Sequence, residues 1–462
     1  MVARLNRLIH DGPSQLLSFH NQWRKTFNGR DEVLNISDIK EERYNQRTMS
    51  FWYYKINVEV ETVMKLKIRR LIFRCVEYGY RFMMIISQRI LPKQDIVMFE
   101  SFLGKQYSDS PKAIYEEWKS RKESRERLIW SVDRRCTEEI PSNVEYVVRL
   151  SLKWVYFMSV SKIWISNSRL PNWLPKDKRT IYLQTWHGTP LKKLALDMNA
   201  VHMPGTNTDQ YKASFKRESS KWDYLISPNR YSSEIFRSAF AFDKTMLEVG
   251  YPRNDLFYNQ KKLQKVIVRV KNELNLPKEK KVILYAPTWR DQQNEGRGQY
   301  RLSLPLDFEK FVSKFGDDYV LLVRFHYLVS ENLDLSNVSP HVLDVSSYPD
   351  IAELYTISDV LITDYSSVMF DFAHLKRPML FYVYDLEEYR DDIRGFYMNF
   401  TEEAPGPLMR TEEELYQTLE AIESVKAKYQ NKLEKFNQRF CEYDNGNAAA
   451  SVVEILAADL RE

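Results

Sequence analysis

A histidine stands in a short turn whose residue types suit the binding of an anion. The apolar run Ile181–Leu183 is typical of a strand, and it leads through Gln-Thr-Trp to His187, Gly188, Thr and Pro190, followed by a pattern typical of a helix start. Gly188 lets the backbone approach a ligand closely, and Pro190 suits a first helical turn whose free amides face an anion. The pattern therefore predicts an anion site within reach of His187. The alternative is an ordinary loop histidine.

Three apolar runs in the second half of the chain also end in polar side chains that suit a diphosphate. The segments that follow these runs are Ala286–Arg290, Arg324–His326 and Thr363–Ser367. An arginine such as Arg290 or Arg324 can hold two phosphate oxygens at once, and His326 can donate to a leaving phosphate. Ser366 and Ser367 are expected to cap a helix and to offer hydroxyls and amides to phosphate oxygens. Helix capping alone would explain one such ending, but three endings favour a site.

The elements that must position these residues alternate between short apolar runs and helical patterns. The alternation begins at Asp95 and starts again after a boundary near Gly250–Asp255. Strands separated by helices of this length imply parallel sheets covered on both faces, with ligands at the carboxyl ends of the strands. The pattern predicts an α/β protein with two doubly wound, Rossmann-type domains facing a cleft, a common place for a nucleotide. The predicted parts are a small N-terminal appendage (1–94), a first domain (95–252) and a second domain (253–462).

Individual elements can be assigned from the same patterns. The strands predicted for the first domain are 96–99, 144–150, 162–165, 181–183 and 224–226. Those predicted for the second domain are 282–285, 320–323, 342–344, 360–362 and 379–381. Helices are predicted from Ile114 through the charged run 119–127, and at 411–440 and 448–460.

The appendage contains a predicted strand at residues 52–61 and a predicted basic amphipathic helix at about 63–93. Arg74, Glu77 and Arg81 interrupt the apolar pattern of the helix, which argues against a transmembrane span. Two interpretations remain open: an interfacial helix on an anionic membrane surface, or a helix packed on the protein's own core. The predicted apolar face holds Met64, Ile68, Leu71, Ile72, Cys75, Phe82, Met83, Ile86 and Ile90.

Composition excludes several classes of protein. The chain has 462 residues, of which 44% are hydrophobic, and a net charge of +5, a bias too weak to indicate nucleic acid by itself. Cys75, Cys136 and Cys441 are far apart and lack zinc-ligand spacing, which predicts a reducing compartment and no structural zinc. The first residues lack the apolar core of a secretory signal, so a cytoplasmic location is expected. The Asp-Asp pairs 317–318 and 391–392 lie away from strand ends, and we predict neither a metal nor a cofactor.

Five segments together carry a family resemblance. They are Thr185–Lys192, Gly250–Asp255, Tyr285–Arg290, Arg324–His326 and Thr363–Ser367. This set resembles the motifs of the CDP-glycerol glycerophosphotransferases, the family of the teichoic acid primases and polymerases of Gram-positive bacteria and of related capsule enzymes. Phe99–Pro111 also resembles the first strand and turn of the family's catalytic part. The resemblance covers about residues 95–440, and residues before Asp95 match none of these motifs.

The resemblance implies a GT-B-like fold and the transfer of glycerol phosphate from CDP-glycerol to a hydroxyl of a lipid-linked teichoic acid or capsule-type acceptor, with release of CMP. The acceptor hydroxyl must lose a proton as it attacks phosphorus, so His187 is the expected general base and His326 a second catalytic group. The resemblance alone assigns Thr288, Trp289, Phe325 and Asp371 to the CDP-glycerol pocket. It also implies that the first domain is on the acceptor side and that the second domain binds CDP-glycerol. The full set of expected substrate-binding residues is Gly188, Thr189, Pro190, Leu191, Arg253, Thr288, Trp289, Arg324, Phe325, Ser366, Ser367 and Asp371.

Other functions stay open at this point. The donor could be CDP-ribitol, because the ribitol enzymes share these motifs, and a GT-B glycosyltransferase that uses a nucleotide sugar would also have two doubly wound domains. A non-catalytic lipid- or polymer-binding module would not need His187 and His326 at strand ends. A lipid-linked acceptor favours the interfacial interpretation of the basic helix. The expected location is then the cytoplasmic face of the cell membrane, as a peripheral protein without a transmembrane span.

Overall fold

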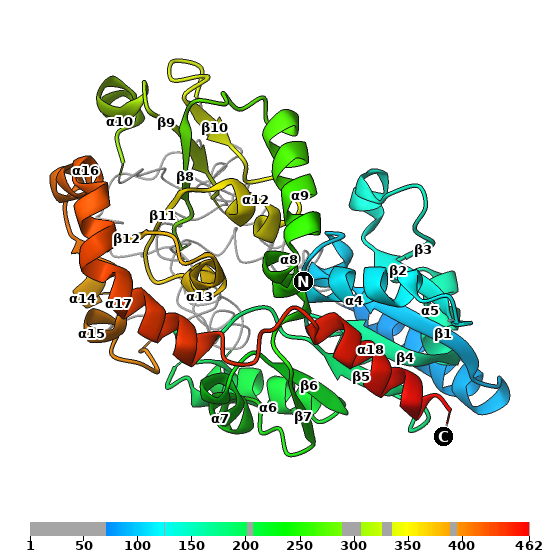
Figure 1. The fold of residues 1–462 in the computed structure, drawn as a ribbon. Coiled ribbons are helices and arrows are strands. Elements are labelled where there is room, and N and C mark those ends of the chain that lie inside the picture. The colour runs from blue at the N-terminus through cyan, green and yellow to red at the C-terminus, as the bar shows by residue number, and fades with distance from the viewer. Residues whose placement is uncertain are drawn as a thin grey trace, which may run out of the picture. The chain divides into compact units, whose positions relative to one another are not determined.

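The computed structural model describes residues 71–123, 125–200, 207–288, 306–325, 335–388 and 395–461. It divides into Met1–Cys75, which is described only from residue 71, and a compact unit of Val76–Glu462. The compact unit contains two parallel β-sheets with helices on their faces (Figure 1). The predicted strand at 52–61 and the first turns of the predicted basic helix lie outside the described residues.

The first sheet has seven strands in the order β3-β2-β1-β4-β5-β6-β7, and every pairing is parallel. The strands are β1 (Gln94–Glu100), β2 (Arg127–Val132), β3 (Tyr146–Val148), β4 (Ser161–Ser166), β5 (Ile181–Gln184), β6 (Tyr224–Ser227) and β7 (Thr245–Glu248). The helical elements that accompany them are η2 (Phe102–Gly104), α4 (Asp109–Ser120), η3 (Arg134–Glu139), α5 (Leu152–Val160), η4 (Ala195–Asp197), α6 (Thr208–Ser219) and α7 (Arg230–Ala239). Both faces of β1 are buried: Val97 and Phe99 pack with α4, and Ile96 and Met98 pack with α5.

The second sheet has six parallel strands in the order β10-β9-β8-β11-β12-β13. The strands are β8 (Lys281–Tyr285), β9 (Tyr319–Val323), β10 (Val342–Asp344), β11 (Val360–Thr363), β12 (Met379–Tyr382) and β13 (Leu408–Met409). The helical elements are α9 (Gln260–Glu273), α10 (Phe308–Phe315), α12 (Ile351–Ile357), α13 (Val368–Phe372), η7 (Ala373–Leu375), α14 (Leu386–Glu388), α15 (Phe400–Glu403), α16 (Glu412–Glu420) and α17 (Ile422–Phe440). Alternate residues of β8 pack on opposite faces, Leu284 with α12 and α17 and Ile283 with α10 and α16.

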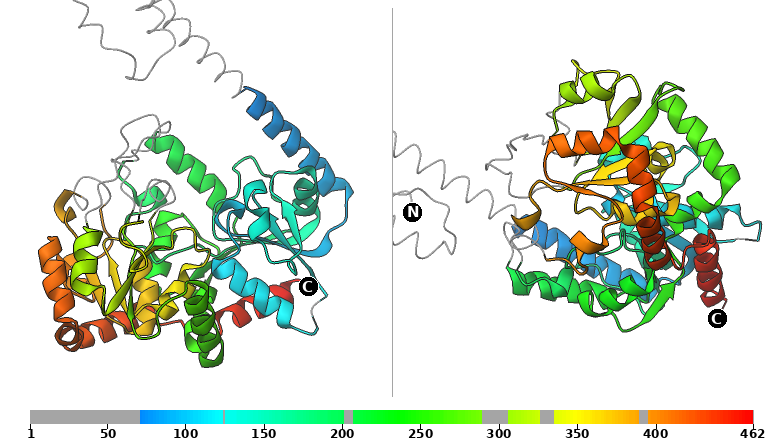
Figure 2. Two further views of the ribbon diagram at one scale, coloured as in Figure 1. Left: turned by 90° about the horizontal axis from the view of Figure 1, so that it is seen from above. Right: turned by 60° about the vertical axis from the view of Figure 1, so that its left-hand side comes forward.

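The chain passes between the two sheets twice. It leaves the first sheet through η5 (Pro252–Asn254) and α8 (Asp255–Tyr258), and it returns after α17, where α18 (Ala448–Asp459) packs against α4 of the first sheet (Figures 1 and 2). The two crossings are bonded to each other, because the Asp255 carboxylate accepts hydrogen bonds from the amides of Ala448 at 3.0 Å and Ala449 at 2.8 Å. Gly250 has φ +84°, and a Cβ there would lie 2.7 Å from a carboxylate oxygen of Asp444. Glycine is therefore required where the crossings meet.

The structure confirms the α/β, GT-B-like fold with two parallel sheets, and the predicted strands are present within a few residues of their expected bounds. Three strands were missed: β2, β7 and β13. The predicted helix through the charged run 119–127 is wrong beyond Ser120, where α4 ends, because the run leads into β2. Its last residue, Arg127, begins a strand whose later residues are buried between β3 and β1, so tertiary packing overrides the local charge pattern.

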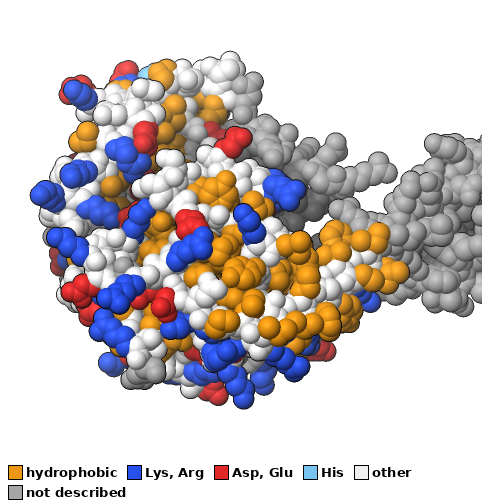
Figure 3. Space-filling model, turned by 90° about the vertical axis from the view of Figure 1, so that its right-hand side faces the viewer, with side chains coloured by type: hydrophobic (Ala, Val, Ile, Leu, Met, Phe, Trp, Pro, Cys, Tyr) orange, Lys and Arg blue, Asp and Glu red, His pale blue; other side chains and the backbone are white. Residues whose placement is uncertain are grey.

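The predicted basic helix is present at residues 71–90 of the described chain. One side packs on the first sheet, where Tyr80, Met84 and Leu91 join its core. From Leu71 onward the predicted apolar face is nevertheless exposed, as Figure 3 shows for this side of the molecule, with Phe82 65% and Ile90 73% accessible. The helix therefore docks on the protein's own core on one side and presents apolar side chains to solvent on the other, and its association with a membrane stays a prediction. Within the described residues, no helix combines the length and apolarity needed to cross a bilayer.

Candidate active site

His187 follows β5 at the carboxyl edge of the first sheet, as predicted. Its Nδ1 lies 2.7 Å from the carbonyl oxygen of Asn167, which directly follows the neighbouring strand β4. A carbonyl only accepts, so this bond places the proton on Nδ1 and leaves the lone pair of Nε2 for a substrate. Burial lowers the pKa of His187, while the hydrogen bond to Asn167 and the charge of Asp109 oppose that shift. Although the surrounding protein removes water from much of the ring, part of the side chain remains accessible to solvent, so a ligand can reach Nε2.

The turn around His187 is held by aromatic packing. Trp186 has φ +55°, an unusual backbone conformation for a large residue, and its ring stacks on that of His187 with centroids 4.4 Å apart. The Trp186 ring also contacts Phe240. The backbone amide of Trp186 donates to the side-chain oxygen of Gln184 at 2.9 Å. The stacked ring of Trp186 therefore restricts the orientation of the His187 imidazole, and the strained backbone of Trp186 places the ring there.

The helix predicted to begin at Pro190 is absent. Leu191 is buried in the core of the second sheet, Lys192 forms an antiparallel bridge with Phe396, and the amide of Lys193 donates to the carbonyl of Gly395 at 3.0 Å. These long-range contacts hold the segment extended, and only the three-residue η4 follows. The expectation of helix-terminal amides at this turn is therefore wrong. Thr189, Pro190 and Leu191 are all buried.

The His187 turn approaches the serine turn of the second sheet. A Cβ built on Gly188 would lie 3.0 Å from Oγ of Ser367, so only glycine allows this approach without displacing the serine. Ser366 and Ser367 lie between β11 and α13, but Ser367 makes no side-chain cap and Oγ of Ser366 is 3.5 Å from the amide of Val368. The predicted helix capping by both serines is thus wrong for Ser367 and marginal for Ser366. The structure nonetheless brings the two predicted motifs together.

The neighbouring strand ends of the second sheet are held by a buried aspartate. Thr288, after β8, donates its amide to both carboxylate oxygens of Asp364 at 2.8 and 3.0 Å.

After β9, Arg324 donates to the carbonyls of Val345 at 2.9 Å and Tyr348 at 2.7 Å. Burial lowers the pKa of Arg324. Through its two hydrogen bonds, Arg324 holds the turn that follows β10.

Phe325 follows Arg324 and is anchored through its backbone, because its amide donates to Oγ of Ser346 at 2.9 Å. Its ring packs edge-on against Tyr285 of β8, with centroids 5.9 Å apart. The predicted residues Trp289, Arg290 and His326 lie outside the described residues.

Arg253 and Asp371, both predicted to bind substrate, form one buried ionic cluster with Asp109. The guanidinium donates to Asp371 at 2.9 and 3.0 Å and to Asp109 at 3.2 Å, and it lies 4.2 Å from the centre of the Tyr251 ring. Burial raises the pKa of Asp371, and Arg253 opposes that shift. Arg253 thus binds two carboxylates from different sheets, Asp109 at the start of α4 and Asp371 in α13.

Asp109 and Asn167 were missed by sequence reasoning. Asp109 has φ +63° and lies inside the segment Phe99–Pro111 that resembles the family, so a signal for it was available. Asn167 acts through its backbone carbonyl, which no residue type reveals. The site therefore depends on two groups that the motifs do not single out.

Comparison with known proteins identifies the family. The family model described as CDP-Glycerol:Poly(glycerophosphate) glycerophosphotransferase matches residues 82–458, most of the chain. The chain belongs to this glycerophosphotransferase family. The predicted family membership is thereby confirmed.

Named members of the glycerophosphotransferase family are similar to this chain over most of its length. The teichoic acid poly(glycerol phosphate) polymerase of Bacillus subtilis is 46% identical over 417 residues, which are 90% of this chain and 56% of that protein. The protein of the same name from Bacillus spizizenii is 49% identical over 395 residues, 85% of this chain and 98% of that protein. The chain thus spans little more than half of one relative and nearly all of another.

A solved structure of the wall teichoic acid polymerase TagF with CDPG shares the fold. It superimposes with a TM-score of 0.79 at 43% identity and covers 88% of this chain and 98% of that one. The GT-B-like architecture of this member of the family is therefore supported by a related structure as well as by its own sheet topology.

Proposed function

We propose that the protein transfers glycerol phosphate from CDP-glycerol to a hydroxyl of a lipid-linked polyol phosphate acceptor and releases CMP. The observation that carries this proposal is the close approach of Gly188 to Ser367, which brings the turn of a reachable histidine against the serine turn of the second sheet. The names of the relatives support the same reaction class.

In the proposed reaction, Nε2 of His187 accepts the proton of the acceptor hydroxyl as that oxygen attacks the β-phosphorus of the donor. The bond between the β-phosphorus and the oxygen that bridges to CMP breaks, and CMP leaves with the electron pair. The carbonyl of Asn167 holds the imidazolium that forms. Donors already in place stabilise the developing phosphoryl charge, and Arg324, Ser366 and Ser367 are the proposed donors. We retain His326 and Trp289 as proposed site residues on the family resemblance.

The test is release of CMP by the purified full chain from CDP-glycerol, with CDP-ribitol and UDP-glucose in parallel and a lipid-linked glycerol phosphate acceptor present. We expect CMP from CDP-glycerol and at most a small fraction of that rate from the other donors. Preferential use of CDP-ribitol would overturn the choice of donor, and release of UDP from UDP-glucose would overturn the reaction class.

We also propose that the protein works as a peripheral protein at an anionic membrane surface, on the cytoplasmic face. The helix at residues 71–90 supports a membrane-surface location, because its outer face exposes large apolar side chains of a kind that globular proteins normally bury. The most exposed are Leu71, Tyr78, Phe82 and Ile90. Arg74, Arg81 and Arg89 on the same helix suit lipid phosphates.

Replacing Phe82 and Ile90 together by glutamate should weaken binding to vesicles of anionic phospholipid by about 10-fold or more, because burial of each side chain is worth about 1.5–3 kcal/mol. A matched control is Val268→Glu, since Val268 is also exposed, at 58%, but lies on α9 of the second sheet. The measurement is vesicle co-sedimentation. Equal binding by the double variant and the control would contradict the proposal.

A further inference from the structure

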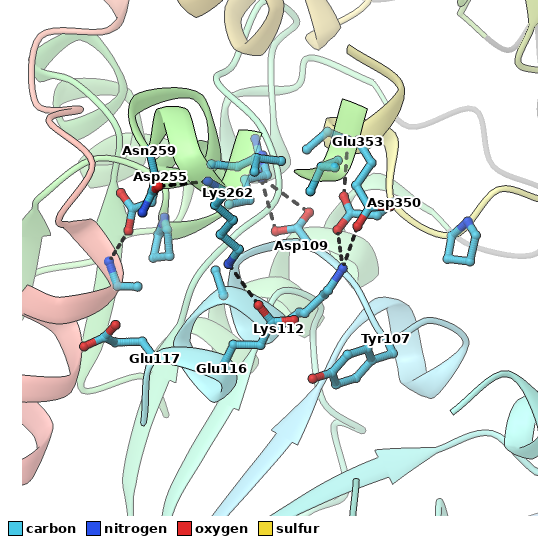
Figure 4. A pocket seen from close by; sticks show the side chains of 18 of the residues that line it. Tyr107, Asp109, Lys112, Glu116, Glu117, Asp255, Asn259, Lys262, Asp350 and Glu353 are labelled. Atoms are coloured by element: carbon cyan, nitrogen blue, oxygen red, sulfur yellow. Dashed lines mark hydrogen bonds and ion pairs between the residues drawn. The ribbon is translucent and has the colours of Figure 1, made fainter. Parts of the chain in front are cut away.

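A pocket of about 980 Å³ lies between the helices of the two sheets, next to the buried Arg253 cluster (Figure 4). Its walls come from α4 of the first sheet, from α9 and the turn before α12 of the second sheet, and from the start of α18. Charged side chains line it, and those shown in Figure 4 are engaged mainly with one another. The pocket is therefore bridged from sheet to sheet by ion pairs.

Lys112 forms one of these bridges, and both of its carboxylate partners are largely buried. Its ammonium lies 3.0 Å from Asp350 and 3.2 Å from Glu353, and the side chain is 19% exposed. Although burial acts to lower it, the carboxylates of Asp350 and Glu353 raise the pKa of Lys112 above its usual value, so the amine stays charged. Glu353 is also fixed by Arg269 at 2.7 Å and by the hydroxyl of Tyr348 at 2.9 Å. Lys112 thus binds a rigid pair of acids.

Each end of this bridge is attached to a residue of the candidate site. On the first sheet, Lys112 lies in the first turn of α4, which begins with Asp109, the partner of Arg253. On the second sheet, Asp350 ends the turn whose carbonyl groups, including that of Tyr348, accept hydrogen bonds from Arg324. The bridge therefore connects the turn of Asp109 to the turn of Arg324.

We propose that Lys112 is a positioning residue for the transfer reaction: by pairing with Asp350 and Glu353 it sets the spacing between the site-bearing turns of the two sheets. This inference rests on the proposed function for its kinetic test. The base at His187 and the donors near Arg324 belong to different sheets, so a reaction that uses both depends on that spacing. A displacement of about 1 Å can cost on the order of 100-fold in rate.

The kinetic test compares Lys112→Met with Lys112→Arg in the full chain. Lys112→Met should lower kcat for CMP release by about 10- to 100-fold and change KM for CDP-glycerol much less, because the donor-side residues stay intact. Lys112→Arg should recover most of the rate, since a guanidinium can bind both acids. Unchanged kcat in Lys112→Met, or failure of Lys112→Arg to recover activity, would overturn the proposal.

Two further variants test the pairing itself. Asp350→Asn keeps an N-cap oxygen for α12 but removes the charge that faces Lys112, and combined with Lys112→Met it should cost little more than Lys112→Met alone. Lys262→Met removes a matched pair across the same pocket, Lys262 with Glu116, whose side chains are 53% and 37% exposed. It should change kcat by less than about threefold because exposed pairs contribute little. If Lys262→Met lowered kcat as much as Lys112→Met, the positioning role assigned to Lys112 would be overturned.

A distance measurement is independent of activity. Spin labels at Lys153→Cys in α5 and Ser313→Cys in α10 report the separation of the two sheets, since both positions are exposed. The background replaces the native thiols by Cys75→Ser, Cys136→Ser and Cys441→Ala. Lys112→Met should broaden the distance distribution and Lys262→Met should leave it unchanged. If wild-type protein releases no CMP, the proposed function fails, whereas an unchanged distribution in Lys112→Met overturns this inference.

Discussion

Replacing His187 by alanine should lower the rate of CMP release by about two to four orders of magnitude. The reason is geometric: Nδ1 is committed to the carbonyl of Asn167, so Nε2 is the ring nitrogen left to take the acceptor proton. The measurement is kcat with CDP-glycerol and the lipid-linked acceptor. His341→Ala is the matched control, because Nδ1 of His341 likewise lies 2.9 Å from a backbone carbonyl, that of Gly316, but in the second sheet away from the site. Full activity in His187→Ala would contradict the assignment.

The pH profile gives a second check on the same residue. A base works only in its neutral form, and burial lowers the pKa of His187 from its usual value near 6.5. The acid limb of kcat/KM should therefore lie below pH 6.5, with an activity plateau above it. A limb that lies clearly above pH 6.5 and moves in no His187 variant would assign that limb to another group.

Replacing Arg253 by methionine should destabilise the protein by about 3–5 kcal/mol, because it leaves the buried carboxylates of Asp109 and Asp371 without a counter-charge. The measurement is the free energy of unfolding from denaturant titration. Lys262→Met is the control, and loss of its exposed ion pair with Glu116 should lower the free energy of unfolding by less than about 1 kcal/mol. Equal stability of the two variants would contradict a structural role for the cluster.

The sign of the pH dependence follows from Asp371. Burial already raises the pKa of this carboxyl, and removal of Arg253 takes away a group that opposes the shift. A carboxyl whose folded-state pKa lies above its unfolded-state value binds its proton more tightly in the folded state. The loss of unfolding free energy caused by Arg253→Met should therefore become smaller as the pH falls through the folded-state pKa of Asp371. Adding Asp371→Asn should recover part of the loss at neutral pH, because one uncompensated charge is removed.

Sequence reasoning predicted the parts of the site that local pattern controls. Strands such as β5 and β11 are short apolar runs, and the side chains that follow them at the carboxyl edge could be read directly, including His187 and Ser367. The family resemblance added Arg253, within the motif Gly250–Asp255, and Asp371, which lies outside the motifs. Their pairing joins residues 118 positions apart, and no local signal reveals such a contact.

Two of the errors near the site arise where one sheet imposes structure on a segment of the other. The residues after Pro190 have a good helical pattern, yet Leu191 enters the second core and Lys192 pairs with Phe396. Once these long-range contacts form, a helix cannot start there. The same reason explains Asp109, whose role depends on an arginine 144 residues later.

The two bonded crossings between the sheets have a mechanical consequence. Asp255 and the amides of Ala448 and Ala449 fasten one connection to the other, and Asp444 lies against Gly250 at the same place. Two connections that are bonded side by side restrain the sheets near the crossings more than a single connection would. Movement of one sheet relative to the other is therefore expected to be smallest near Gly250–Asp255 and largest at the strand ends farthest from that region.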